Sequence, residues 1–531
     1  MRISAILACL VMGGLLFAGG GRAKSTCRVR LTLTDEAGTK PIAGLVRIVD
    51  ADGRAVSVEE LLSRGLGLDG EFPIHQWLVV PHAVEFDLPA AKYTISAIAG
   101  LETEEARREV NLAGLSESHI TIALKQFRDL ASEGFRSGNT HLHLMKVSRE
   151  TADRYLREVP AADGLDLLFL SYLERADADR DYISNGYTAA DLARLTRESK
   201  VLFGNGEEHR HNFTAQGEGY GHVMFLDIRE LIQPVSIGPG IMKTGHDGLP
   251  LQRGIDAARR GGATAIWCHN EWGMEALPNW MAGRVDAQNI FDGGIRSSYK
   301  DSFYRCLNAG LAVPFSTGTD WFMYDFSRVY VRVEGELTSV KWLKALAQGR
   351  SFITNGPLLD LRVKDRLPGD TVKLAGAEKI AVVAHGTGRL DFERIELIRN
   401  GEIVAHAATR RVRGHYEAEL KMTLDIAQPC WLALRTPPQS VPDDPELRKA
   451  APLNEFGREL FAHTSPVYVT VGGRGVFIPE VARALLEKMK KSRAMVAEQG
   501  RFEDDLAKAR VLDVHNEGIA ALERRLAEDA R

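Results

Sequence analysis

Two histidines one residue apart, His141 and His143, stand in the segment Gly138-Asn139-Thr140-His141-Leu142-His143. In a β-strand, residues two apart point to the same face, so both imidazoles can reach one ion. Further potential ligands follow along the chain, each after a short apolar run typical of a strand: Glu207, Glu208, His222, His269 and Asp320. Imidazoles and carboxylates suit divalent zinc, manganese or iron without a thiolate. The pattern predicts a metal site; the alternative is that these groups cap helices and hydrogen-bond to one another.

The positions beside these residues fit the same interpretation. Gly221 precedes His222, so the backbone can pass close to an ion there. Asp320 ends the polar segment Ser316-Thr317-Gly318-Thr319-Asp320, where a carboxylate can be exposed at the end of a strand. Cys268 directly precedes His269, and alternation would point it away from that histidine. We interpret Cys268 as a buried structural thiol.

The elements expected to position these residues alternate between strand and helix. Nearly continuous apolar runs at 165–170, 201–203, 223–226, 263–268 and 312–315 are typical of strands buried on both faces, a habit of parallel sheets. Helical patterns lie between them, at 188–199 and 251–260. This alternation predicts an α/β barrel or a doubly wound sheet, in which chemistry collects beyond the carboxyl ends of the strands. Most of the candidate ligands lie near those ends.

The flanking regions differ from the central one in their hydrophobic pattern. Alternating strands and frequent turns predict a β-sandwich at 27–126 and a second at 354–472, where Asn400-Gly401 is a hairpin signal. We interpret His75, His82 and His119 of the first region as structural. The tail at 476–531 predicts two helices broken near Gly500, packing on the body or on another subunit.

Length and composition bound the remaining questions. The 531 residues suggest three or four domains, and a net charge of -4 gives no electrostatic footprint for nucleic acid. Residues 1–23 have the basic start, apolar core and small residues of a secretory signal peptide. No later stretch reaches about 18 apolar residues, so we expect no membrane span. The prediction is an exported protein, periplasmic or extracellular; the alternative is an uncleaved N-terminal anchor.

The motifs resemble the PHP (polymerase and histidinol phosphatase) superfamily of metallohydrolases, particularly its CehA/McbA-like branch. The resemblance covers roughly residues 130–470 and is carried by Gly138 to His143, Gly206-Glu207-Glu208, Gly221-His222, Cys268-His269-Asn270 and Thr319-Asp320. It implies a distorted β/α barrel at 130–353 that holds two or three metal ions, and it favours Glu208 over Glu207 as a ligand. The segments Gly349-Arg350-Ser351-Phe352 and Thr354-Asn355-Gly356-Pro357 resemble the start of the sandwich that follows many such barrels.

Two departures from the family pattern reduce the expected number of ions. The family has an Asp-His after its second strand, whereas here Leu170 is followed by Ser171-Tyr172-Leu173-Glu174-Arg175. It also ends in Asp-x-His, whereas Phe322 occupies that last position here. We therefore predict one or two ions, Zn, Mn or Fe. The predicted ligands are His141, His143, Glu208, His222, His269 and Asp320. Glu174, His209, His211 and His246 are alternatives that we interpret as structural or supporting.

The resulting functional prediction is a hydrolase of phosphoester, or of carboxylic or carbamate ester, bonds in a small-molecule substrate, acting through a metal-activated water. The predicted catalytic residues are Glu208, Asp320, Arg175 and Arg210, the two arginines steadying an oxyanion. Two alternatives stay open: a catalytically reduced, secreted metal- or carbohydrate-binding protein, and a domain that uses a metal only to hold its fold. Aromatic residues near the strand ends could stack on a sugar or organic substrate or simply pack the core: Tyr220, Trp267, Trp272, Trp280, Trp321 and Tyr324.

Overall fold

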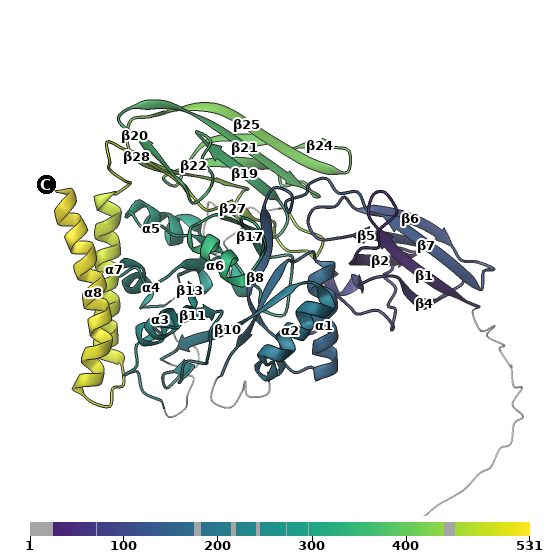
Figure 1. Ribbon diagram of the computed structural model, residues 1–531, viewed down its shortest axis with the longest axis horizontal. Helices are drawn as coiled ribbons and strands as arrows, with labels where there is room; N and C mark the ends of the chain where they lie inside the picture. Colours follow the sequence, from purple (N-terminus) through teal and green to yellow (C-terminus); the bar gives the residue numbers. More distant parts are fainter. Residues whose placement is uncertain are drawn as a thin grey trace, which may run out of the picture.

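The computed structural model describes residues 25–70, 72–174, 182–213, 219–240, 245–271, 273–295, 297–439 and 452–530. The predicted signal peptide, Arg175 and Trp272 lie outside these residues. The described chain is a mixed α/β structure in which strands dominate (Figure 1). This agrees with the predicted α/β class.

Two small sheets form the N-terminal region. The strands are β1 (Thr26–Thr34), β2 (Gly44–Asp50), β3 (Leu78–Val80), β4 (Val84–Pro89), β5 (Lys92–Ile98), β6 (Ala106–Asn111) and β7 (Glu117–Ala123), with a 3-10 helix η1 (Pro73–Gln76). Their orders are β4-β1-β7 and β3-β2-β5-β6. The expected alternation is present in β1, where Val29, Leu31 and Leu33 are fully buried. These side chains share one core with Ile48 and Ile95 of the other sheet, so the two sheets pack face to face.

A curled sheet forms the central region, which begins with β8 (Phe135–His143), β9 (Leu167–Tyr172) and β10 (Leu202–His211) in parallel. The following strands are β11 (Gly221–Leu226), β12 (Ser236–Ile237), β13 (Thr264–Trp267), β14 (Ala287–Asn289), β15 (Phe315–Ser316), β16 (Asp320–Trp321), β17 (Arg328–Arg332) and β18 (Ser351–Thr354). The pairing of β16 with β8 closes the sheet. Closure brings the ends of β8, β10, β11, β13 and β16 to one place.

The parallel habit that the apolar runs favoured does not extend to β11. This strand lies between β10 and β13 and runs antiparallel to both, whereas β13, β14 and β15 are parallel. All six residues of β11 are buried. An apolar run indicates that both faces of a strand are buried. A strand can be buried in this way whether it runs parallel or antiparallel to its neighbours.

Helices cover the curled sheet. They are α1 (Arg149–Ala162), α2 (Ala189–Ser199), α3 (Leu251–Arg260), α4 (Ala276–Met281), α5 (Arg305–Asn308) and α6 (Ser339–Ala347), with the short turns η2 (Ile183–Gly186), η3 (His269–Glu271), η4 (Asp292–Gly294) and η5 (Lys300–Tyr304). The helices predicted at 188–199 and 251–260 are confirmed. Thr188 caps α2 in a reciprocal capping box with Asp191, which satisfies backbone N–H groups at the start of the helix.

The C-terminal strands are β19 (Leu358–Val363), β20 (Thr371–Leu374), β21 (Glu378–Gly388), β22 (Arg394–Arg399), β23 (Glu402–Ala408), β24 (Arg410–Val412), β25 (His415–Ile426), β26 (Cys430–Arg435), β27 (Ala462–Thr464) and β28 (Val467–Val471). Strands β19-β21-β25-β24 form a separate sheet, whereas β27 pairs with β18 and joins the others to the central sheet. Asn400 and Gly401 both have positive φ in the tight turn between β22 and β23. This confirms the hairpin signal.

Two long helices form the tail, α7 (Pro479–Gln499) and α8 (Asp505–Asp529), and the break at Gly500 confirms the prediction. They lie side by side along the edge of the central region, where α8 contacts α4 (Figure 1). Leu485, Met489, Val511 and Leu522 are buried in the same core as the β11 and β13 side chains. The tail therefore packs on the body of its own chain.

Candidate metal centre

His141 and His143 at the end of β8 point into one space. Their Nε2 atoms lie 3.0 Å apart, and neither side chain is exposed. The chain passes very close behind them, because a Cβ atom on Gly318 would lie 2.5 Å from the Cβ of His141. Only glycine fits there, so the segment leading to Asp320 can lie directly against β8.

Glu208 on β10 lies between two groups of histidines. Its Oε2 is 3.2 Å from His143 Nε2 and 4.0 Å from His141 Nε2. Its Oε1 is 3.0 Å from His222 Nδ1 and 3.7 Å from His269 Nε2. The carboxylate can therefore bridge the two groups. The neighbouring Glu207 points elsewhere and contacts His209 instead.

His269 follows β13, and Asp320 begins β16. Both have positive φ, at 54° and 60°, a conformation that side-chain-bearing residues rarely adopt. Asp320 Oδ1 lies 3.4 Å from His141 Nε2 and 3.7 Å from His143 Nε2. The backbone is thus held in an uncommon conformation where these two side chains enter the cluster.

The six predicted ligands come together as two overlapping sets of donor atoms. His141, His143, Glu208 and Asp320 form one set, and Glu208, His222 and His269 form the other; within each set the donor atoms lie within 4.8 Å of one another. Their number suits the predicted count of one or two ions. Metal binding by these residues stays a prediction. The hydrogen bonds and charges of the side chains show whether they suit a divalent ion.

The hydrogen bonds of the imidazoles select the form that a metal needs. His143 Nδ1 lies 2.9 Å from the carbonyl oxygen of Ser171, which only accepts, so Nδ1 donates and Nε2 presents its lone pair. The same holds for His141 and His269, whose Nδ1 atoms each lie 2.9 Å from a carboxylate oxygen of Asp292. His222 Nε2 lies 3.1 Å from Asn212 Oδ1, which leaves Nδ1 towards Glu208.

Two of these lone pairs, those on Nε2 of His141 and His143, face carboxylate oxygens without a hydrogen-bond donor. Glu208 Oε2 and Asp320 Oδ1 are buried and accept no hydrogen bond from the described residues. Lone pairs aimed at buried, unsatisfied oxygens are unfavourable unless a metal cation lies between them or the imidazole takes up a proton. The donor set therefore fits a divalent metal ion.

The pKa shifts show how strongly the carboxylates and imidazoles interact. Burial alone would lower the pKa of His141 and His269, but the nearby carboxylates outweigh it and raise both. Burial alone would raise the pKa of Glu208, but Arg210 and His222 outweigh it and hold this pKa well below its usual value. Burial and the charge of Glu208 raise the pKa of Asp320.

Asp292 is a residue of this site that the sequence reasoning missed. It is fully buried in η4, and one oxygen contacts each of His141 and His269. Oδ1 also accepts the backbone N–H of His269 at 2.9 Å. The contacts with the two imidazoles hold the pKa of Asp292 far below its usual value despite its burial. The adjacent Gly293-Gly294 after a short strand is the only signal that could have indicated it.

The other candidate histidines lie outside the cluster. His209 Nδ1 contacts Glu207 at 2.8 Å, and His211 Nε2 contacts Asp247 at 2.8 Å. His246 is half exposed, with its Nε2 3.8 Å from Glu503. Each has its own carboxylate partner, which agrees with a structural interpretation.

The positions that depart from the family pattern contribute no ligand side chain. Glu174 accepts a hydrogen bond from the Tyr172 hydroxyl at 3.1 Å. The Ser171 carbonyl accepts from His143, and its hydroxyl accepts from the Leu142 N–H. Phe322 is buried in the apolar core, edge-on to Tyr155. The Cys268 thiol lies near His141 and Asp292, and burial raises its pKa well above the usual value. This environment keeps it a neutral thiol, as expected of a structural cysteine.

A cavity of about 370 Å³ opens onto the cluster. It is lined by Glu208, Arg210, His222, His269, Ile295, Asp320 and Trp321. Arg210 is 8% exposed and forms an ion pair with Glu208, Nη1 to Oε2 3.6 Å, while its Nε is buried without a hydrogen-bond partner among the described residues. The Trp321 ring lies 5.0 Å from that of His143. One cationic and one aromatic side chain thus border the space in front of the cluster.

The other predicted aromatic contacts divide between core and rim. Trp267, Trp280 and Tyr220 are buried in the central core. Tyr324 donates a hydrogen bond to the carbonyl of Phe291 beside η4. The alternative of core packing therefore holds for Trp267, Trp280 and Tyr220. Trp321 is the predicted aromatic side chain that lines the cavity.

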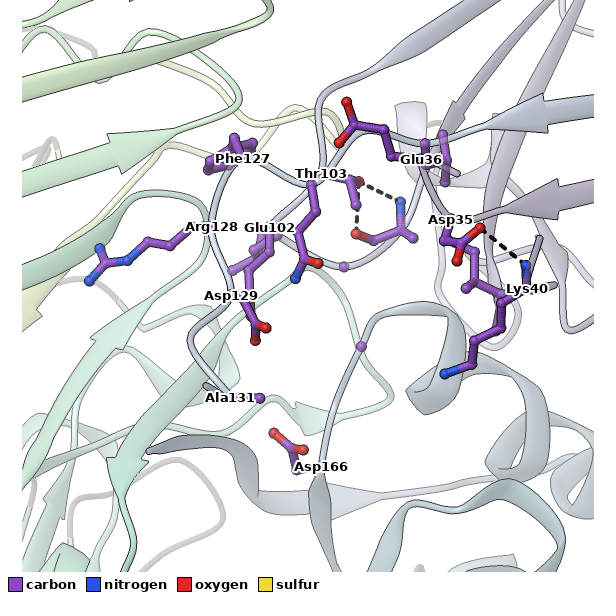
Figure 2. A pocket seen from close by; sticks show the side chains of 18 of the residues that line it. Asp35, Glu36, Lys40, Glu102, Thr103, Phe127, Arg128, Asp129, Ala131 and Asp166 are labelled. Carbon is purple, nitrogen blue, oxygen red and sulfur yellow. Dashed lines mark hydrogen bonds between the residues drawn. The ribbon is translucent and has the colours of Figure 1, made fainter. Parts of the chain in front are cut away.

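A larger cavity, of about 740 Å³, lies between the N-terminal region and the central sheet (Figure 2). Glu102 and Asp166 border it, and burial raises the pKa of both carboxyls. Glu102 accepts hydrogen bonds from the Leu130 N–H and the Tyr330 hydroxyl, and Asp166 from Ser137. No histidine is among the described residues that line this space, so its chemistry differs from that of the histidine–carboxylate cluster.

The chain matches no known family profile and no curated protein. A crystal structure of a two-domain protein from Bacteroides vulgatus, described as containing a predicted PHP-like metal-dependent phosphoesterase, resembles it with a TM-score of 0.33 and 13% identity. The match covers 58% of this chain and 92% of that one. We infer nothing about the chemistry of this chain from that likeness. Among the described residues no helix is long and apolar enough to cross a membrane.

Proposed function

We propose that this protein is a metal-dependent hydrolase of ester bonds in small molecules, of the PHP type. The observation that carries the proposal is the cluster itself: two buried carboxylate oxygens that accept no hydrogen bond from the described residues lie within 4.0 Å of the Nε2 atoms of His141 and His143. His141, His143, Glu208 and Asp320 would hold one ion, and Glu208, His222 and His269 a second. A divalent ion bound there supplies a nucleophile at neutral pH, because it lowers the pKa of a water to about 7.

The side chains around the cavity have separate roles in this proposal. Asp320, whose pKa is raised, would accept a proton from the attacking water at Oδ2, because Oδ1 is the oxygen that faces His141 and His143. Arg210 would hold the oxyanion of the substrate, because its guanidinium borders the cavity and its Nε has no hydrogen-bond partner in the described part of the chain. Trp321 and Ile295 give the cavity an apolar wall for the rest of the substrate. Arg175, the other predicted oxyanion residue, stays a sequence-based proposal.

Arg210 favours a phosphoester over a neutral carboxylic or carbamate ester. A nearly buried guanidinium with a partnerless Nε gains most from an anionic ligand. Among the described residues, Glu208 is the carboxylate that pairs with Arg210. When that carboxylate is shared with metal ions, an anionic substrate would balance the charge of the arginine.

A second candidate is a metal-binding protein without hydrolytic activity. The family ligands missing after Leu170 and at Phe322 favour it, because those positions contribute no metal-binding side chain. We further propose export after removal of residues 1–23. Mass analysis of protein from an expressing bacterium would show a cytoplasmic, full-length chain if this is wrong.

Hydrolysis by the metal-loaded protein tests the function. We expect Mn²⁺- or Zn²⁺-loaded protein to cleave p-nitrophenyl phosphate or its diester faster than p-nitrophenyl acetate. The His141→Ala/His269→Ala variant should lose this activity, while His246→Ala, half exposed and outside the cluster, should keep it. Metal-loaded protein that cleaves no ester would favour the binding protein, and cleavage by the double variant would place the site elsewhere.

A further inference from the structure

The N-terminal region reaches the segment that carries Asp320 through one arginine. Arg64 lies in the long connection between β2 and β3, and its side chain is 0% exposed. Its Nε and Nη2 donate to both oxygens of Asp163, at 3.0 and 2.6 Å, where Asp163 caps the end of α1. This two-point ion pair fixes the guanidinium between the N-terminal region and the central sheet.

The other donors of Arg64 are directed at the loop that follows Asp320. Nη2 donates to the carbonyl of Asp325 at 3.2 Å, and Nη1 donates to the carbonyl of Met323. The Met323 N–H in turn donates to the Tyr155 hydroxyl of α1 at 2.9 Å. Two carbonyls of one short loop are thus held by a side chain from a different region of the sequence.

A second residue of the same connection, Gly67, packs against this loop. A Cβ atom on Gly67 would lie 2.2 Å from the ring of Phe322, so only glycine allows the close approach. Phe322 has φ +48°, and Asp320 has φ +60°. Two left-handed residues within three positions are unfavourable and persist only where surrounding contacts hold them.

The Asp320 carboxylate depends on that backbone. Its Oδ1 is buried and accepts no hydrogen bond from the described residues, although it lies 3.4 Å from His141 Nε2. Its position is therefore set by its backbone, which is held by the pairing of β16 with β8 and by the conformation of the following chain to residue 326.

We propose that Arg64 is a positioning residue for Asp320, so that the N-terminal region is part of the metal centre; this rests on the proposed function. Arg64 would act on the set of donor atoms that contains Asp320. It has no contact with Glu208, His222 or His269. Loss of its hydrogen bonds should therefore affect one donor set and spare the other.

Arg64→Lys is the variant that tests this. Lysine keeps a positive charge beside Asp163, but its three N–H donors cannot replace the four hydrogen bonds of the guanidinium. Arg389→Lys is the matched control. Arg389 is 6% exposed, forms an ion pair with Glu455 and donates to the carbonyls of Gly100 and Thr103. It lies 5.9 Å from the centre of the Phe326 ring, a cation–π contact that lysine can keep, but it donates to no carbonyl of the Asp320 loop.

The measurement is calorimetric titration of each full-length, metal-free protein with Mn²⁺. We expect Arg64→Lys to weaken one of two equivalents by about 10- to 100-fold, the range for residues that orient ligands, and to leave the other unchanged. Arg389→Lys should bind both as the wild type does. Wild-type binding by Arg64→Lys, or the same loss in both variants, would overturn the proposal.

Gly67→Ala decides the question if Arg64→Lys does not fold. The added methyl displaces Phe322 while the Arg64–Asp163 pair remains, so the same equivalent should weaken; unchanged binding would overturn the proposal. Failure of the proposed function has a different signature. A wild type that binds Mn²⁺ yet cleaves no ester refutes hydrolysis and leaves the role of Arg64 to the titration, whereas a wild type that binds no Mn²⁺ overturns both.

Discussion

Imidazole tautomers are the most informative detail of the site at the scale of single residues. His141, His143 and His269 each donate from Nδ1 to an oxygen behind the ring, so each presents Nε2 to the same space. The convergence of three such rings on two carboxylates is the arrangement by which proteins orient metal ligands. It also makes proton and metal compete for the same atoms.

This competition predicts a pH dependence. The folded pKa of His141 and His269 lies above the usual 6.5, so in metal-free protein their protonation stabilises the fold below pH 6.5. That stabilisation is lost as the pH rises through the raised folded pKa. Metal needs the neutral rings, so Mn²⁺ should raise the melting temperature more at pH 8 than at pH 6. A shift of the same size at both pH values would contradict this.

Asp292 provides a second prediction at this scale. Asn at position 292 can accept with one atom only, so one of the two imidazoles loses its acceptor. We expect Asp292→Asn to weaken Mn²⁺ binding about 10- to 100-fold in a calorimetric titration. Asp286→Asn, which removes a partly buried carboxylate bound to the Ala265 N–H, is the control and should bind Mn²⁺ normally. Equal affinities in all three proteins would remove Asp292 from the site.

Secondary-structure elements explain which ligands could be predicted. His141, His143, Glu208 and His222 follow or lie in runs whose alternation or apolarity indicates a strand, and adjacent strands bring such residues together. Asp292 follows the three-residue strand β14, which is too short for a periodic signal. The direction of β11 could not be predicted from its apolar residues either, because burial does not depend on strand direction.

Glu275 tests the account of how α3 is held. Its carboxylate is 0% exposed and accepts the backbone N–H groups of Leu251 and Gln252 at the start of this helix. Burial raises its pKa from 4.5 to about 7, so the folded state prefers the protonated form. Its contribution to stability is therefore present below pH 4.5 and is lost as the pH rises to about 7.

Replacing this group removes the pH dependence that it causes. Between pH 4.5 and pH 8, the free energy of unfolding of Glu275→Gln, measured in urea, should increase relative to that of the wild type by an amount on the order of 3 kcal/mol. The absolute stability of the variant can be lower, since Gln accepts with one oxygen only. A difference that does not change with pH would show that Glu275 stays ionised in the fold.

Buried arginines join distant parts of the sequence at the scale of the whole molecule. Arg64 links the N-terminal region to the loop after Asp320, and Arg389 links it to the C-terminal strands through Gly100 and Thr103. Such partners are hundreds of residues apart, and neither arginine stands in a motif. The sequence could indicate a barrel with flanking β-rich regions, but not that the N-terminal region contacts the site.

Arg389→Ala measures how firmly these regions are joined. It leaves Glu455 and two carbonyls without their donor, and breaking a buried pair in this way costs about 3–5 kcal/mol. Urea unfolding should show this loss. Arg362→Ala, which removes an exposed pair with Asp360, should lie within about 1 kcal/mol of the wild type. Similar stabilities for the two variants would mean that the Arg389 contacts do not hold the regions together.

The central claim is that Glu208 bridges two metal-binding sets of side chains. Elemental analysis of metal bound to purified full-length protein, equilibrated with Mn²⁺ and freed of excess, tests it most directly. The wild type should retain about one to two equivalents, and Glu208→Gln should lose affinity at both sets because both share this carboxylate. His246→Ala should match the wild type. A wild type without metal, or a Glu208→Gln variant that retains its full complement, would contradict the account.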